Sequence, residues 1–184
     1  EIKTLLDDST EISSNPTVSP AGVLTITAID STSDVSAINN NVKLKVEVAH
    51  GSNVNLDINK LGLDNAGSNS DELMINGALN ATAAQLKELL DGGVTITGAG
   101  SVVIDNYTGQ NISALTNEGI KLTLDIDDEL TDISLTTDNL GNLNNITAIQ
   151  VAENTSVAMT SDLGAELATK FVSENSTFGE LKFS

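Results

Sequence analysis

"NISALTNEGIKLTLDI" (residues 111–126) repeats the pattern of an earlier stretch of the chain, "DVSAINNNVKLKVEV" (residues 34–48). Both stretches have Ser-Ala-aliphatic followed by Lys-Leu-x-aliphatic, in which apolar and polar residues alternate. Such alternation predicts a β-strand with one buried face. The sequence therefore predicts a strand that returns after an interval of about 78 residues.

Further matches keep the same order along the chain, which indicates tandem repetition. The alternative is chance similarity in a sequence rich in Leu, Thr and Asp. The matched pairs are 1–9 with 85–93, 19–26 with 97–104, 53–58 with 131–136, 71–77 with 147–153, and 82–90 with 161–171.

We interpret these matches as modules of one repeat. Residues 1–81 form a first module that begins inside a junction helix, residues 82–160 form a second, and residues 161–184 are the start of a third or a C-terminal cap. The expected context is a longer tandem array.

Within a module the pattern is mostly that of strands, with one helix. Thr82 and Gln85 form a capping box, and Gly92 and Gly93 end a helix over residues 82–91. Alternating runs follow at 94–97, 101–104, 121–126, 131–136, 147–152 and 156–160.

The strand pairs recur about every 26 residues, which is typical of a solenoid. We therefore predict a mainly β chain, a solenoid-like stack of short strands with one short helix per module. The alternative is two β-sandwich, immunoglobulin-like beads.

The phrases at 82–100, 111–119 and 140–155 resemble the tandem repeats of large bacterial surface proteins, namely surface-layer proteins and type I-secreted adhesins of the repeat-in-toxin class. The Gly-Gly-x-Gly-x-Asp calcium motif of that class is absent from this sequence. The resemblance implies secretion, display on the cell surface and a structural role.

Composition excludes several classes of partner. The formal net charge is −18, and all 8 basic residues are Lys. Phosphate binding depends on clustered basic residues, so nucleic acid is not expected as a partner. No apolar run approaches the ~18–20 residues that span a bilayer, so membrane insertion is not expected.

Catalysis has few residues to use. His50 is the only His, in a stretch that predicts a polar turn, and Cys is absent. The usual nucleophile and base pairs are therefore missing, and we predict that the chain is not an enzyme. A carbohydrate-active β-solenoid enzyme that uses Asp125 and Asp127 is a remaining alternative, because two carboxylates suffice for glycoside hydrolysis.

The acidic segment after the strand at 121–126 is the main candidate site. Asp125 and Asp127 fall on the polar face of the strand, Asp128 and Glu129 fall in the turn, and Asp132 follows it. We favour a solvated edge, and the alternative is a calcium site, because Ca²⁺ takes six to eight oxygen ligands.

A second oxygen-rich loop spans residues 64–72. It offers Asp64, Asn69, Asp71 and Glu72 as weaker calcium ligands. The order of ligands known from helix-loop-helix calcium sites is missing, so a turn is favoured here too.

Three of the four aromatic residues, Phe171, Phe178 and Phe183, cluster near the end of the sequence. They predict either ordinary core or a contact with the next module or with a partner chain.

Together these observations predict a non-enzymatic, structural segment of a secreted cell-surface or surface-layer protein. It would assemble with copies of itself or with neighbouring modules through repeat stacking, with calcium as a possible cofactor. The alternative is an adhesin repeat that binds a glycan or protein ligand on its loops.

Overall fold

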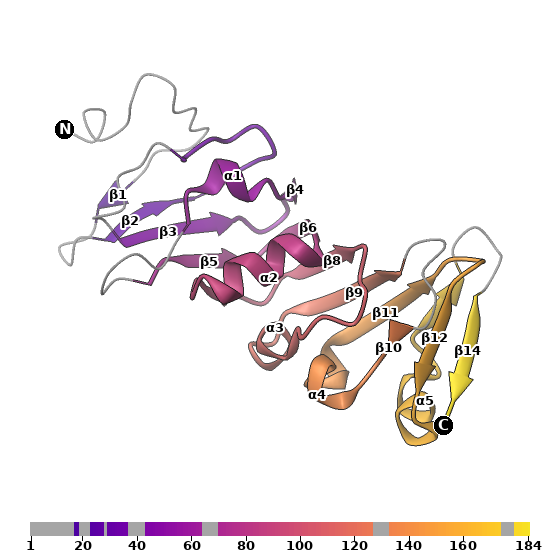
Figure 1. The fold of residues 1–184 in the computed structure, drawn as a ribbon. Coiled ribbons are helices and arrows are strands. Elements are labelled where there is room, and N and C mark those ends of the chain that lie inside the picture. The colour runs from indigo at the N-terminus through magenta and orange to yellow at the C-terminus, as the bar shows by residue number, and fades with distance from the viewer. Residues whose placement is uncertain are drawn as a thin grey trace.

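The structure is a computed structural model that describes residues 17–18, 23–27, 29–36, 43–63, 70–126, 133–173 and 179–184. In this part of the chain 40% of residues lie in strands and 23% in helices, which confirms the prediction of a mainly β chain. Figure 1 shows an elongated molecule with β2 near one end and β14 at the other.

The described strands are short. They are β1 (Thr17–Val18), β2 (Val23–Ile26), β3 (Lys43–Val48), β4 (Asn53–Asn55), β5 (Glu72–Ile75), β6 (Ala78–Thr82), β7 (Thr95–Thr97), β8 (Ser101–Asp105), β9 (Lys121–Ile126), β10 (Ile133–Ser134), β11 (Ile146–Val151), β12 (Ser156–Met159), β13 (Phe171–Ser173) and β14 (Glu180–Phe183). Each of the six alternating runs of the second module overlaps one of them.

Five α-helices are described, together with a short 3-10 helix. They are α1 (Ile58–Leu61), α2 (Ala83–Asp91), α3 (Ser113–Asn117), α4 (Thr137–Leu140), α5 (Ser161–Leu167) and the 3-10 helix η2 (Leu143–Asn145).

The predicted helix at 82–91 is α2, and its capping box is present, with the Thr82 hydroxyl accepting from Gln85 N. The prediction of one helix per module is wrong, because α1, α3 and α4 are further helices of four or five residues. Such helices are too short to show a helical period, and two of them begin at a side-chain cap, Asp57 or Thr136.

The strands form three sheets. One has the order β1-β2-β3-β5-β7, another β4-β6-β8-β9-β11-β13, and the smallest β10-β12-β14. Among the described strands every pairing is parallel except that of β1 with β2. Immunoglobulin-like sandwiches are built from antiparallel sheets, so the alternative of two such beads does not describe this chain.

Because neighbouring strands are parallel and in register, side chains of the same kind stack into columns. At one level of the six-stranded sheet, Val54, Leu79, Val102, Leu122 and Ile146 are paired in turn, and none is more than 2% exposed. Burial of one such side chain contributes about 1.5–3 kcal/mol relative to leaving it in water. The core is thus a set of aliphatic columns that run along the molecule.

The sheets change partners between β8 and β9. From β3 to β8 the strands come in consecutive pairs, with the first strand in the five-stranded sheet and the second in the six-stranded sheet. β9 begins the next pair, but it joins β8 and not β7. From β9 onward the first strands extend the six-stranded sheet, and the second strands form the three-stranded sheet.

The helices follow this change. α3 contacts β7 and α4, so helical structure continues beyond the point where the five-stranded sheet ends. Figure 1 shows α3, α4 and α5 in a row along one side of the molecule.

The junction between β8 and β9 has a counterpart one repeat interval earlier in the chain. Val102 pairs with Leu122 there, and Leu24 pairs with Leu44 between β2 and β3. The two paired residues are separated by the same number of residues in both junctions. All four side chains are buried.

Hydrogen bonds also recur at nearly this interval. Ile29 N donates to Glu47 O at 3.3 Å, and at the corresponding place in the later junction Tyr107 N donates to Asp125 O at 2.9 Å. Further pairs are Ser36 N to Asp34 Oδ1 with Ser113 N to Asn111 Oδ1, and Ser101 N to Gly77 O with Glu180 N to Thr155 O.

We predict that Leu79→Ala lowers the free energy of unfolding by about 2–5 kcal/mol, because it opens a cavity in the middle of an aliphatic column. Urea denaturation followed by circular dichroism measures this change. Asn80→Ala is the matched control. Asn80 is the next residue of β6, half-buried on the outer face, and its Nδ2 donates to Asn55 Oδ1 at 2.9 Å. Its loss should cost about 1 kcal/mol. Equal losses for the two variants would contradict the assigned faces of the strand.

Candidate functional site

The acidic segment lies at the end of β9, where the described part of the chain contains only its first member. Asp125 is half-buried on the outer face of β9 and is paired in register with Gln150 of β11. Asp127, Asp128, Glu129 and Asp132 lie outside the described residues. The predicted calcium site therefore stays a prediction.

A second carboxylate, Asp105, is the last residue of β8, the strand next to β9. Ile104 of β8 pairs with Leu124 of β9, so the next residues, Asp105 and Asp125, lie at the same level on neighbouring strands. Like charges opposite each other on a sheet repel, and solvent, a shared proton or a cation relieves the repulsion. The sequence signal for this pair is the constant offset between β8 and β9, but it is readable only once the two strands are known to be parallel neighbours.

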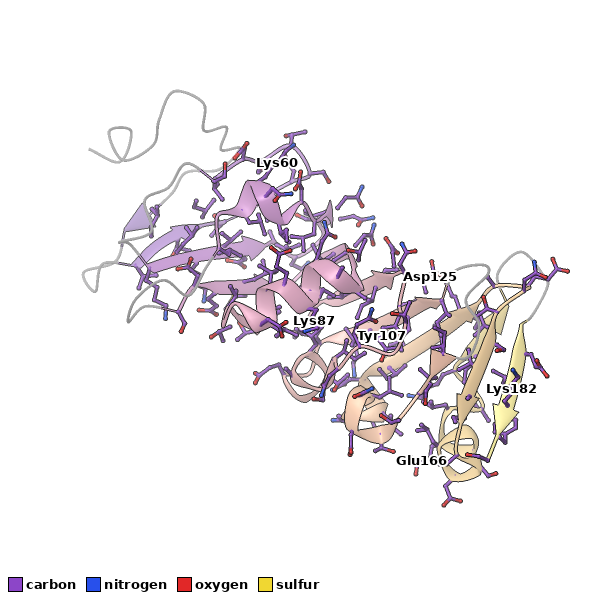
Figure 2. All side chains as sticks on the ribbon, viewed as in Figure 1. Lys60, Lys87, Tyr107, Asp125, Glu166 and Lys182 are labelled. Carbon is purple, nitrogen blue, oxygen red and sulfur yellow. The ribbon has the colours of Figure 1, made fainter. Side chains whose placement is uncertain are left out.

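The neighbourhood of this pair is the junction between β8 and β9. Tyr107 N donates to Asp125 O, and the Tyr107 ring is fully buried. Figure 2 shows Tyr107 and Asp125 in the middle of the molecule, where the sheets change partners. The acidic pair is therefore carried by a packed part of the fold.

The residues of the second oxygen-rich loop, 64–72, do not form one loop, because the strand β5 begins at Glu72. Asp64 and Asn69 lie outside the described residues. Asp71 is 5% exposed, and its Oδ1 accepts from Leu44 N at 2.8 Å. Glu72 begins β5, and adjacent residues of a strand point to opposite faces. The structure thus does not bring Asp71 and Glu72 together as two ligands of one ion.

Glu72 belongs to a polar row on the outer face of the five-stranded sheet. Its Oε1 accepts from Lys45 Nζ at 3.1 Å and from Thr97 Oγ1 at 2.8 Å. Burial alone would raise the pKa of the Glu72 carboxyl, but the hydrogen bonds from Thr97 and Lys45 outweigh burial and hold the pKa below its usual value. The row ties three successive strands of the sheet together.

A buried polar network joins α3 to the next turn of the chain. Asn145 Nδ2 donates to Thr116 O at 2.6 Å, and Thr116 Oγ1 donates to Leu140 O at 2.8 Å. Lys121 Nζ donates to Asn145 Oδ1 at 2.6 Å. Thr116 and Asn145 are both buried, and paired polar groups of this kind fix the position of neighbouring segments.

His50 lies exposed in the turn between β3 and β4. An open groove of about 500 Å³ runs past this turn and is also lined by Asn53, Asn76, Ser101 and Lys121. These side chains offer hydrogen bonds, but the lining contains no carboxylate that would pair with His50 as acid and base. Over the described residues, no three His, Cys, Asp or Glu side chains are grouped so that they could hold a metal ion.

Comparison of the chain with protein-family models, curated proteins and solved structures finds no match. The resemblance to bacterial surface repeats therefore stays a prediction. None of the described helices has the length and apolar character needed to cross a membrane.

We predict that Glu72→Gln lowers the free energy of unfolding at pH 7 by about 1 kcal/mol, because the amide replaces charge-assisted hydrogen bonds with neutral ones. The folded-state pKa lies below the unfolded one. The stabilisation is therefore present above the unfolded pKa and is lost as the pH falls through the folded pKa.

Urea denaturation of both proteins between pH 7 and pH 3 tests this pH dependence. Glu88→Gln is the control, because Glu88 is exposed on α2. A difference between wild type and Glu72→Gln that is the same across the pH range would show that the carboxylate charge contributes nothing.

Proposed function

We propose that this chain is a non-enzymatic structural segment of a secreted cell-surface or surface-layer protein, built as a solenoid-like stack of repeated modules. One observation supports this most directly. The junction at β2 and β3 recurs at β8 and β9 with the same strand offset and matching backbone hydrogen bonds. A structure that repeats its own junction is suited to extension by further repeats.

The pairing geometry supports the solenoid. Partners in the parallel pairings lie one turn of the chain apart in sequence, as Val102 and Leu122 do at the shorter end of the range and Val46 and Leu73 at the longer end. Each turn of the chain therefore returns to the same level of its neighbour and contacts mainly that neighbour. Stability in such an array comes from nearest-neighbour interfaces, which favours a scaffold over a catalytic role.

The polar surface fits an exposed, extended object. Most outer positions of the six-stranded sheet are occupied by small or polar side chains such as Asn55, Asn80, Ser101 and Thr123. With a net charge of −18, neighbouring chains repel one another in the absence of counterions. We therefore propose that divalent cations at the cell exterior, calcium in particular, screen this negative charge and permit assembly.

We predict that millimolar Ca²⁺ raises the melting temperature and promotes assembly, measured by calorimetry and light scattering against a chelator. For a chain of this size each kcal/mol of stabilisation corresponds to about 2–4 °C. Replacing Asp125, Asp127, Asp128 and Glu129 by their amides should remove the response.

The control variant carries Asp162→Asn and Glu166→Gln, which remove exposed charge from α5. It should respond to Ca²⁺ as the wild type does. A melting curve that is the same in Ca²⁺ and in chelator would contradict the calcium part of the proposal. The absence of any ordered assembly by electron microscopy would count against the structural role itself.

A further inference from the structure

The described part of the chain exposes two large apolar side chains, and both lie at its C-terminal end. Val172 on β13 is 39% exposed and Phe183 on β14 is 55% exposed. β13 and β14 are each the last strand of a sheet. Figure 2 marks the end of the molecule at β14 by Lys182. The edges of β13 and β14 are not equivalent, because the corresponding strands earlier in the chain differ in whether a further strand pairs with them.

β14 corresponds to β8 and to β2. Leu79 pairs with Val102 of β8, and one repeat interval after Leu79, Val157 pairs with Leu181 of β14. The preceding glycines agree, because a Cβ at Gly100 would lie 2.2 Å from Gly77 O and one at Gly179 would lie 2.4 Å from Thr155 O. The inward residues Leu24, Val102 and Leu181 therefore share one position, and Ile26, Ile104 and Phe183 share the next.

Burial at these shared positions differs sharply. Ile26 and Ile104 are both 0% exposed, whereas Phe183 is 55% exposed. β2 and β8 are each covered on this edge by a parallel strand, β3 and β9 respectively. Among the described strands, β14 has no such neighbour. The exposed Phe183 marks the place that β3 and β9 fill at the earlier junctions.

The backbone hydrogen bonds of β14 also indicate an open edge. Glu180 N donates to Thr155 O at 2.8 Å and Ser184 N donates to Met159 O at 3.1 Å, both toward β12. Backbone groups alternate in direction along a strand, so the N–H and C=O groups of Leu181 and Phe183 face the open edge. An open edge of this kind is a template for another strand.

We propose that the edge of β14 binds the first strand of a second copy of this module, in parallel register, as β8 binds β9. The incoming strand has the Lys-Leu-x-aliphatic pattern of β3 and β9, and its counterpart of Leu122 pairs with Leu181. The inference rests on the proposed function only in that it assumes further modules of the same repeat.

The short helix before the incoming strand completes the contact. α3 contacts β7, and Ile96 of β7 is only 4% exposed. Ile96 and Phe171 hold corresponding positions, because they pair with Leu73 and Ile149 in the strands before them. Phe171 is only partly buried. A second α3 would lie against β13 and Phe171 as α3 lies against β7.

The edge of β13 provides an internal control. Its counterpart, β7, is the last strand of its sheet even though β9 follows it in the chain. The same junction at the C-terminal end would therefore pair β14 and leave the edge of β13 unpaired. We therefore expect a following module to cover Phe183 and to leave Val172 exposed.

The test uses the full chain extended after Ser184 by a second copy of residues 106–184. Ser184 follows Phe183 as Asp105 follows Ile104, so this fusion reproduces the β8-to-β9 connection. Amide hydrogen exchange is measured in the first copy. The amides of Leu181 and Phe183 should exchange at least ~100-fold more slowly than in the chain alone, because a paired edge opens only by local unfolding.

Two variants of the first copy make the test specific. Phe183→Asp should return the Leu181 amide to fast exchange, while continued protection of the Glu180 amide reports that β14 remains paired with β12. Val172→Asp should leave the protection intact. Fast exchange at Leu181 and Phe183 in the extended chain would overturn the proposal, as would loss of protection in Val172→Asp with Phe183→Asp unaffected. Neither result affects the calcium and assembly tests of the proposed function, which are independent of this experiment.

Discussion

Parallel, in-register pairing of short strands sets both the path of the chain and the arrangement of the core. A parallel strand cannot follow its partner through a tight turn, so each turn of the chain must travel around the molecule before it pairs. The wide sequence separation of paired residues, such as Val46 and Leu73, and the short helices on the return path follow from this requirement. In-register pairing in turn stacks aliphatic residues such as Leu79 and Val102 into continuous columns.

The change of sheet between β8 and β9 adds a second requirement, because the interior must stay filled where the strands change partners. Tyr107 meets it with a fully buried ring whose hydroxyl donates to Gln110 O at 2.8 Å. Burial raises the pKa of the Tyr107 hydroxyl, which keeps it a neutral donor. Ile29 holds the corresponding place at the earlier junction and is 2% exposed. Large apolar side chains thus fill the interior at both junctions.

The sequence predicts much of the local structure and little of the pairing. The alternation in "KLTLDI" and the capping box at Thr82 both identify their elements, because those signals are contained within a short stretch of chain. The parallel direction of the strands, the change from β7 to β8 as partner of β9, and the placing of Asp105 and Asp125 on neighbouring strands depend on residues far apart in the sequence. A periodic pattern states which face is buried, and it leaves open which strand lies alongside. The short helices α1 and α4 escape prediction because a cap and a single helical turn carry no period.

The most direct test of this account is the hydrogen bond that joins β9 to β8, from Lys121 N to Gly100 O, which measures 3.0 Å. Scalar coupling across hydrogen bonds, measured by nuclear magnetic resonance on the deuterated full chain, identifies the acceptor of each amide directly. The account predicts a coupling between the Lys121 amide nitrogen and the Gly100 carbonyl carbon. A coupling from Lys121 to a carbonyl of β7 would contradict it, because β9 would then extend the five-stranded sheet and the chain would not change sheets at that point.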